Sequence, residues 1–420
     1  MAEAPAGGVL FKNAAVLDTR VPALLDAQNV LVQGERVVEI GAGLRPPDAA
    51  RVIDLRGRTL MPGLIDCHVH VTAASADLAL LADWAPTYVA ARASDILGGM
   101  LRRGFTTVRD AGGADFGLSA AVEEGYFAGP RLRFGGKALS QTGGHADMRP
   151  AGRAVLDPSY SCPSFGTVCD GEAELRRAAR EELRRGAHHL KLMLSGGVAS
   201  PTDRIDSTQF SLAEIRAVVE EAEAANRHVL GHAYTSRAIN RGLACGVRSI
   251  EHGNLMDPSS IPLFREHGAF YVPTLVTYWA MAEHGRASGL PVASQGKVAD
   301  VLNAGLHALE LAHRGGVPIA FGTDLLGAMH QYQTREFRIR AEVQSAADII
   351  QSATVVGARL LDLEDEAGVV APGARADLLV LDGDPLRNVG LLAEPDDHPR
   401  LVMQSGRVIV DTLGLGSRVR

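Results

Sequence analysis

Short apolar runs and amphipathic stretches alternate along most of the chain. From about residue 60 to residue 363, eight segments have the apolar and β-branched character of strands. Segments with the spacing of amphipathic helices lie between them, and several end in Gly just before the next strand. The clearest predicted helices are 172–187, 212–227, 235–246 and 298–316. The predicted strands are 63–70, 105–112, 131–136, 188–194, 228–234, 247–253, 269–275 and 317–324.

This alternation predicts an α/β fold with a (β/α)8 TIM barrel, whose usual size is about 250 residues before insertions. A doubly wound open sheet is the rival architecture, and the count of eight strands favours a closed barrel. Both ends of the chain read as short strands with turns, and neither has enough strands for an independent sheet. We therefore predict that 1–60 and 366–420 pair into one small β-sandwich domain, which flanks a barrel formed by 61–365.

One connection departs from the alternation. Residues 137–171 are rich in Gly and Pro and have no convincing periodicity. Loops of this length in compact domains are usually lids or binding loops. Because the segment follows the third predicted strand, we expect it to lie over the catalytic face of the barrel.

Composition narrows the class of protein. The 42 basic and 49 acidic residues give a net charge of −7, which argues against a nucleic-acid partner. No apolar run reaches about 18 residues and no signal peptide is recognisable, so we predict a cytoplasmic protein without a membrane span. The four cysteines include no CxxC pair, which favours free thiols over a disulfide scaffold or a cysteine zinc site. They are Cys67, Cys162, Cys169 and Cys245.

A lysine in the fourth predicted strand raises a question. The stretch AHHLKLMLSGG, residues 187–197, reads as a buried strand that ends at a turn. Strand alternation places Lys191 on one face with His189 and Met193. Lysines are almost never fully buried unless they are paired. Something on this face must therefore compensate an ammonium group, or the group is not an ammonium.

Six polar residues occur in or at the ends of five of the predicted strands. In a barrel the carboxyl ends of the strands meet at one rim, where active sites are built. An HxH pair alone is a weak signal, and a single strand histidine is more often a core residue than a ligand. The conjunction of imidazoles and a carboxylate at one rim is what a divalent metal site needs. The six predicted ligands are His68, His70, Lys191, His232, His252 and Asp324.

The arrangement resembles the amidohydrolase superfamily. The resemblance rests on PGLIDCHVH (62–70), LKLMLSGG (190–197), GHAY (231–234), IEHGN (250–254), FGTD (321–324) and the tail GVVAPGARADLLVLDGDP (368–385). In the binuclear branch, the strand-four lysine is carboxylated by CO2 and bridges two metal ions. Lys191 would then be an anionic ligand, since burial favours the neutral amine that attacks CO2.

The resemblance also implies a cofactor and a mechanism. Two Zn2+ ions would be bound, one by His68, His70 and Asp324 and the other by His232 and His252, with carboxylated Lys191 between them. A metal-activated hydroxide would attack an amide carbonyl. Asp324 would accept its proton and pass it to the leaving nitrogen.

Two features favour one group within the superfamily. A strand-four lysine is present, and Thr235 stands where mononuclear deaminases carry Glu. GHAY, SIEHG and the loop SQTGGHAD (140–147) resemble the Xaa-Pro dipeptidase and carboxypeptidase-like group, which cleaves dipeptides or N-acyl amino acids, in some members ochratoxin A. By this resemblance His145 and Tyr234 would contact a small-molecule or dipeptide substrate, and the chain would form a homo-oligomer. Neither Arg149 nor Arg204 is selected as a carboxylate-binding residue.

Two other classes stay open. A mononuclear deaminase or a cyclic-amide hydrolase of the imidazolonepropionase kind would hold one metal ion and be indifferent to bicarbonate. A catalytically inactive relative that acts as a binding protein would have lost ligands, and all six positions are filled.

Overall fold

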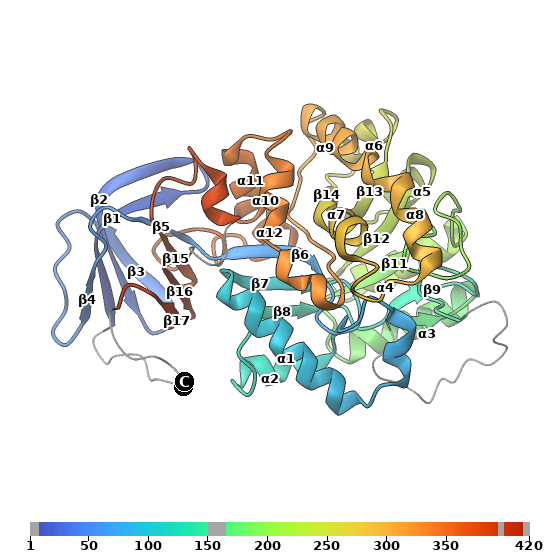
Figure 1. The fold of residues 1–420 in the computed structure, drawn as a ribbon, viewed down its shortest axis with the longest axis horizontal. Coiled ribbons are helices and arrows are strands. Elements are labelled where there is room, and N and C mark those ends of the chain that lie inside the picture. Colours follow the sequence, from blue (N-terminus) through green and yellow to red (C-terminus); the bar gives the residue numbers. More distant parts are fainter. Residues whose placement is uncertain (1–7, 150–164, 394–398, 415–420) are drawn as a thin grey trace.

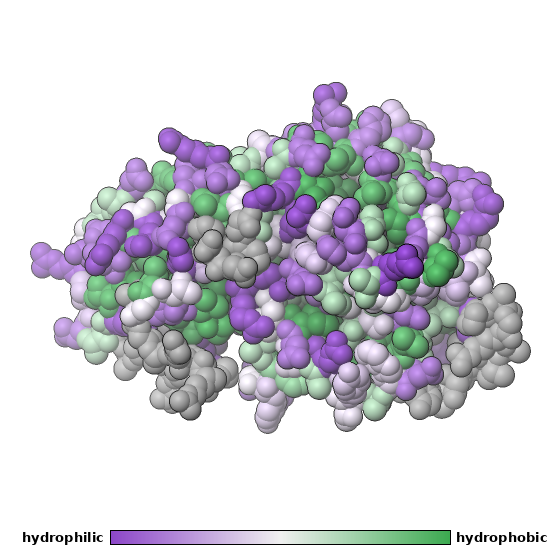
Figure 2. Space-filling view, viewed as in Figure 1, coloured by the Kyte–Doolittle hydropathy of each residue, from purple (hydrophilic) through white to green (hydrophobic). Residues whose placement is uncertain are grey.

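The computed structural model describes residues 8–149, 165–393 and 399–414. Figure 1 shows two parts along the long axis of the molecule: a part made mainly of strands, and a larger part in which helices surround strands. On the face seen in Figure 2, hydrophilic side chains are spread over both parts, with apolar patches between them. Within the described residues, no helix combines the length and the apolar character that crossing a membrane requires.

The larger part is built on parallel strands. One sheet contains β6 (Leu64–Val69), β7 (Phe105–Asp110) and β8 (Arg131–Phe134). The other has the order β10-β9-β11-β12-β13-β14, again with parallel neighbours. Its strands are β9 (Ala138–Ser140), β10 (Gly166–Val168), β11 (His189–Met193), β12 (His228–Thr235), β13 (Ser249–Leu255) and β14 (Phe270–Val272).

Backbone hydrogen bonds outside the regular strands join the two sheets into a closed barrel. On one side, the His188 amide donates to the Phe134 carbonyl over 2.9 Å. On the other side, residues 317–324 bridge the gap between β14 and β6. There the Ala320 amide donates to Tyr271 over 2.9 Å, and the Cys67 amide donates to Phe321 over 2.7 Å. The (β/α)8 architecture predicted from the alternation is confirmed.

Two predicted elements differ from the structure. The eighth strand, 317–324, is not a regular strand and keeps only an isolated bridge between Tyr271 and Ile319. Two features explain this. Pro318 lacks an amide donor, and the backbone of Asp324 has a φ of 53°. The helix predicted over 298–316 is two helices, α8 (Val292–Leu302) and α9 (Ala304–Arg314), which meet at Asn303, a poor helix former.

The other predicted helices are present, and further helices complete the barrel. The segments 172–187, 212–227 and 235–246 correspond to α3 (Gly171–Arg184), α4 (Leu212–Ala224) and α5 (Ser236–Leu243). A capping box between Ser211 and Glu214 begins α4. The remaining helices are α1 (Pro86–Arg102), α2 (Phe116–Glu123), α6 (Ser260–Glu266), α7 (Leu275–His284), α10 (Arg335–Arg340), α11 (Ala346–Ser352) and α12 (Val355–Leu360), with 3-10 turns at Leu78–Asp83, Gly327–Tyr332 and Val389–Leu392.

The strand-rich part joins the two ends of the chain, as predicted. An antiparallel ladder between β5 and β15 pairs Leu60 with Val380. The Val37 amide donates to the Ala374 carbonyl over 2.9 Å and so connects β3 to the segment before β15. The strands pack around an apolar core that includes Phe11. The strands are β1 (Val9–Asp18), β2 (Ala23–Gln33), β3 (Arg36–Gly41), β4 (Arg51–Asp54), β5 (Thr59–Pro62), β15 (Leu378–Leu381), β16 (Leu401–Gln404) and β17 (Arg407–Asp411). The division at residues 60 and 365 stays a prediction.

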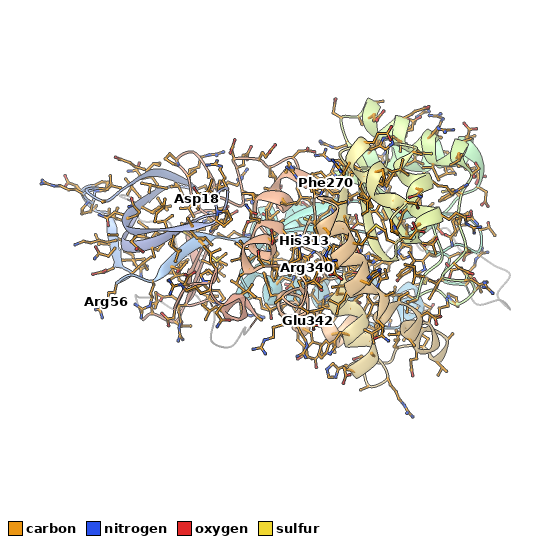
Figure 3. All side chains as sticks on the ribbon, turned by 90° about the horizontal axis from the view of Figure 1, so that it is seen from above. Asp18, Arg56, Phe270, His313, Arg340 and Glu342 are labelled. Carbon is orange, nitrogen blue, oxygen red and sulfur yellow. The ribbon has the colours of Figure 1, made fainter. Side chains whose placement is uncertain are left out.

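A buried ion pair fixes the irregular eighth segment of the barrel. Arg340 is fully buried in the helical region seen in Figure 3, and its Nε lies 3.2 Å from Glu336 Oε1. Its two terminal nitrogens donate to Ser352 Oγ over 2.7 Å and to the Ala320 carbonyl over 3.1 Å. Glu336 accepts from the Val276 amide over 2.7 Å. The pair therefore connects the segment 317–324 to the start of α7.

Removing this arginine should destabilise the fold strongly. Arg340→Met leaves Glu336 as a buried carboxylate without a counter-ion, which costs about 3–5 kcal/mol in the free energy of unfolding. The measurement is a guanidinium titration at about pH 8, above the pKa of about 7 to which burial raises Glu336. As a control, Arg314→Met on the exposed face of α9 should change the free energy by less than about 0.5 kcal/mol. Equal values for both variants would contradict the prediction.

Candidate metal centre

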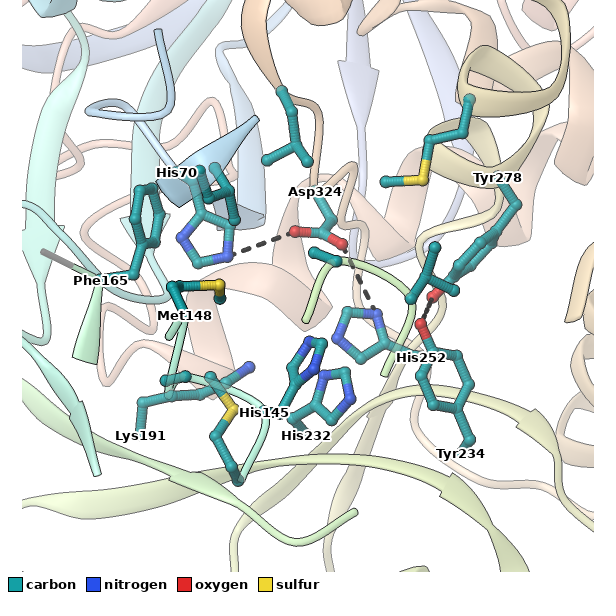
Figure 4. Close-up of a pocket in the computed structure, with 17 residues that line it drawn as sticks. His70, His145, Met148, Phe165, Lys191, His232, Tyr234, His252, Tyr278 and Asp324 are labelled. Atoms are coloured by element: carbon teal, nitrogen blue, oxygen red, sulfur yellow. Dashed lines mark hydrogen bonds and ion pairs between the residues drawn. The ribbon is translucent and has the colours of Figure 1, made fainter. Parts of the chain in front are cut away.

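The six predicted ligands gather at the carboxyl ends of the barrel strands. Five of them line one cavity, and His68 is buried outside its lining. Figure 4 shows the side chains of these five around the cavity, namely His70, Lys191, His232, His252 and Asp324. Apolar side chains make up much of the remaining wall. The described lining is Leu78, Ala146, Met148, Phe165, Met193, Val198, Ala199, Met281 and Leu326, together with His70, His145, Lys191, His232, Tyr234, His252, Tyr278 and Asp324.

The most closely spaced candidate metal ligands lie at the end of β6 and at the end of the segment 317–324. One ligand atom each from His68, His70 and Asp324 lies within 4.8 Å of the others. Asp324 Oδ1 is 3.4 Å from His68 Nε2 and 3.3 Å from His70 Nε2. Burial by itself raises the pKa of the Asp324 carboxyl, but its contacts with His68 and His70 hold that pKa well below its usual range. Asp324 is therefore a carboxylate, as a metal ligand must be.

A chain of charges inside the barrel orients His68. Its Nδ1 lies 2.7 Å from Glu251 Oε2, and Glu251 accepts from Arg109 Nη2 over 2.8 and 2.9 Å. Although burial raises the pKa of Glu251, the Arg109 guanidinium and His68 hold it well below its usual range. A carboxylate only accepts hydrogen bonds, so Nδ1 of His68 carries the proton. In the neutral imidazole, Nε2 is then the lone pair on the side of Asp324, and this buried atom has no hydrogen-bond partner among the described residues.

In two further histidines, Nδ1 forms a hydrogen bond with a residue that does not line the cavity. His70 Nδ1 donates to the Gly112 carbonyl over 2.7 Å, and His252 Nδ1 lies 2.8 Å from Thr274 Oγ1. The ring of His252 is 4.5 Å from the ring of His232 and 4.9 Å from that of His68, measured between centroids. Hydrogen bonds to one nitrogen are the usual way in which proteins aim the other nitrogen of a histidine at a metal.

Lys191 lines the same cavity as His70, His232 and His252. Its side chain is 1 % exposed, and no hydrogen bond or ion pair engages its Nζ among the described residues. Burial lowers the pKa of Lys191 to about 8, opposed by the charges of Glu251 and Asp324. With that pKa, about a tenth of the lysine is the neutral amine at pH 7, far more than for a lysine with an ordinary pKa.

The backbone is strained at two of the predicted ligands. His252 has a φ of 74° and Asp324 a φ of 53°, in the left-handed region that residues other than Gly rarely adopt. Such conformations persist where the surroundings enforce them, and they concentrate at functional sites. Together with the orphaned nitrogen of His68 and the unpaired Lys191, they make a donor set that fits a bound divalent metal.

The predicted substrate contacts have different surroundings. His145 and Tyr234 both line the cavity. The hydroxyl of Tyr234 lies 2.9 Å from that of Tyr278, and burial raises the pKa of both phenols above their usual range. The arginines that were left open lie elsewhere: Arg149 pairs with Asp147 and Arg204 with Asp206, and neither lines the cavity.

Three residues that support the centre escaped the reading of the sequence. Arg109 and Glu251 occur within segments predicted as buried strands, so the argument applied to Lys191 would have singled them out. Tyr278 carries no comparable signal, because it lies in α7 among apolar residues. Of the four thiols, Cys67, Cys169 and Cys245 are free and buried, and Cys162 lies outside the described residues.

Comparison with known proteins identifies the family. The model of the "Amidohydrolase family" matches residues 59–409. The chain belongs to the amidohydrolase family. It is 32 % identical to the ochratoxinase of Aspergillus niger over 352 residues, covering 80 % of this chain and 72 % of that protein. Membership makes the protein a hydrolase that acts on amide bonds, in a family that depends on metals.

Solved structures agree with this membership. A prolidase crystallised with N-methylphosphonate-L-proline is 49 % identical, with a TM-score of 0.94 and coverage of 96 % of this chain and 99 % of that one. A Xaa-Pro dipeptidase with bound methionine is 30 % identical, with a TM-score of 0.85 and coverage of 95 % and 99 %. The resemblance read from the motifs is confirmed at the level of family and fold.

The chain from Arg109 through Glu251 to His68 generates a prediction about metal affinity. Glu251→Gln replaces the carboxylate that fixes His68 with a neutral amide and removes the counter-charge of Arg109, so metal affinity should fall by about 10- to 100-fold. Competitive dialysis against a chelator, followed by metal analysis, measures this change. Glu182→Gln, at a buried glutamate of α3 that does not line the cavity, serves as the control and should retain its metal. Equal metal retention by both variants would show that Glu251 does not orient a ligand.

Proposed function

We propose that this chain is a binuclear zinc hydrolase that cleaves the amide bond of dipeptides or N-acyl amino acids. The observation that carries the proposal is the buried Lys191, which has no hydrogen bond or ion pair among the described residues and lines one cavity together with His70, His232 and His252. A lysine in that position suits a carboxylated bridging ligand and has no place in a mononuclear site. The names of the relatives, a prolidase, a Xaa-Pro dipeptidase and an ochratoxinase, support this substrate class.

The residues present fit two metal ions. His68, His70 and Asp324 would hold one, His232 and His252 the other, and Lys191 in its carboxylated form would bridge them. When bound, the ions would supply a water activated at neutral pH and a Lewis acid for the scissile carbonyl. The low pKa of Asp324 keeps it ionised at neutral pH, which is the form that can accept a proton. Its carboxylate would transfer that proton to the leaving nitrogen, which an amide requires.

Two further side chains would act on the substrate. Tyr278 can donate its hydroxyl proton to the oxygen of Tyr234, which leaves the proton of Tyr234 for the negative charge that develops on the carbonyl oxygen. His145 would contact the scissile carbonyl or the substrate carboxylate. The apolar wall formed by Met148, Phe165 and Met281 favours substrates with apolar groups and limits the access of water.

A panel of dipeptides and N-acyl amino acids tests the proposal, with Xaa-Pro dipeptides and ochratoxin A included. We expect release of the free amino acid from at least one member. Lys191→Ala and Asp324→Asn should each reduce the rate by at least about 100-fold, as expected when a group acting in the transition state is removed. Lys12→Ala and Asp300→Asn, at exposed positions, are the controls. Undiminished activity in both cavity variants would refute the assignment.

Carboxylation of Lys191 can be observed directly. The zinc-loaded protein in 13C-labelled bicarbonate should give one carbamate carbon signal in its NMR spectrum, which is absent from Lys191→Ala. Metal analysis should find about two zinc equivalents per chain. One equivalent, without a carbamate signal, would instead indicate the mononuclear deaminase or imidazolonepropionase-like alternative.

A further inference from the structure

His145 reaches the cavity from a loop and not from a strand. It follows β9 by five residues, and its ring stacks on that of His232 at a centroid distance of 4.1 Å. A group on a loop needs partners that fix its ring before it can act with precision. We infer that Asp203 and Lys297 are positioning residues that hold His145 with Nε2 directed at the substrate. This inference rests on the substrate contact proposed above for His145.

A hydrogen-bond chain leads from His145 to Asp203. His145 Nδ1 lies 2.8 Å from Ser200 Oγ and 3.5 Å from Asp203 Oδ2. The hydroxyl of Ser200 is in hydrogen-bond contact with Asp203 Oδ1. Because a hydroxyl has one proton and the carboxylate only accepts, Ser200 donates to Asp203 and accepts from Nδ1–H of His145. The chain thus sets the tautomer and leaves Nε2 as the nitrogen available on the cavity side.

Asp203 is itself held in place from two sides. Gln209 donates to Asp203 Oδ2 over 3.0 Å, and its carbonyl oxygen accepts from the backbone amide of His145 over 3.0 Å. The side chain of Asp203 is 3 % exposed. Burial raises the pKa of Asp203, but hydrogen bonds from His145 and Ser200 and the charge of Lys297 hold it at about 2. A buried carboxylate therefore faces the imidazole.

Lys297, on α8, fastens the segment that carries Ser200 and Asp203. Its Nζ donates to the carbonyls of Gly197, Ser200 and Asp203 over 2.9, 2.9 and 2.7 Å. An ammonium has three protons, so these three carbonyls satisfy it fully. It also lies 3.4 Å from Asp203 Oδ1 and balances that charge. A helix on the cavity side of the barrel is thereby joined to the support of His145.

Gly197 completes the support. A Cβ at this position would collide with the ring of His145, so only glycine allows the ring to lie against this segment. The imidazole is then bounded by Gly197, by the ring of His232 and by the hydrogen bond at Nδ1. Histidine nitrogens at functional sites are commonly fixed in this way by a partner on the opposite nitrogen.

A double-mutant cycle tests whether Asp203 acts through His145. Asp203→Asn should lower kcat/KM by about 10- to 100-fold in the wild-type background, the usual loss when an orienting partner is removed. In a His145→Ala background the same change should have less than about 2-fold effect, since the group that it positions is gone. Asp206→Asn, an exposed acid in the same segment, is the matched control. An equal loss in both backgrounds would overturn the inference.

Two further substitutions act on the same support from other sides. Gly197→Ala should displace His145 and reproduce the loss in kcat/KM, whereas Gly296→Ala, at an open position of α8, should not. Lys297→Met should show the same non-additivity with His145→Ala. Activity of Gly197→Ala at the wild-type level would contradict the close fit on which the inference depends.

A spectroscopic measurement separates this inference from the proposed function. Protein labelled with 15N-histidine should show a downfield, exchange-protected Nδ1 proton of His145, identified by its loss in His145→Gln. Asp203→Asn should shift or remove this signal, and Asp206→Asn should leave it. If the signal behaves so while no amide in the panel is cleaved, the function fails and the support of His145 stands. If the signal is unaffected by Asp203→Asn, the inference fails even in an active enzyme.

Discussion

The cavity depends on a compensated charge deep inside the barrel. Arg109, Glu251 and His68 are completely buried, and each is stable there only because the next one neutralises it or hydrogen-bonds to it. The barrel interior of most such folds is packed with branched apolar side chains. Here Arg109, Glu251 and His68 replace part of that apolar packing. Their contacts orient the imidazole of His68 so that its Nε2 is available as a ligand. These buried polar residues therefore orient a ligand of the candidate metal centre, although apolar side chains in their place would stabilise the barrel more.

The other histidines of the site also have one ring nitrogen engaged by a partner, and His232 Nε2 lies 3.2 Å from the Gly196 carbonyl oxygen. His70 uses a backbone carbonyl, His252 a threonine hydroxyl and His145 a serine that leads to a carboxylate. A carboxylate partner makes the imidazole more basic than a carbonyl does. A carboxylate partner therefore occurs at two histidines of the cavity region: Glu251 contacts the predicted metal ligand His68, and Asp203 acts on His145 through Ser200.

Much of this could be predicted from the sequence, and the limits have physical causes. Strand alternation and the position of polar residues at strand ends were enough for the barrel and for the convergence of His68, His232 and Asp324, because both follow from local periodicity. The eighth strand was predicted too regular, because its path is set by tertiary hydrogen bonds: the Tyr271 amide donates to the Pro318 carbonyl, and the amide of the strained Asp324 donates to the His68 carbonyl. The supports of His145 could not be predicted: Ser200, Asp203 and Lys297 meet only after two loops and a helix have packed, and no spacing encodes that meeting.

The division of labour between strands and loops follows from these supports. Side chains on strands have directions fixed by the ladder, so the donors that must meet within a few ångströms stand on or directly after strands. Loops tolerate change in sequence and length, and they suit groups that distinguish one substrate from another. A loop residue close to the reacting atoms then needs a support of its own. Lys297 supplies part of it by binding three backbone carbonyls, so the position of His145 depends on the path of the chain and on the placement of α8 as well as on Asp203 and Gly197.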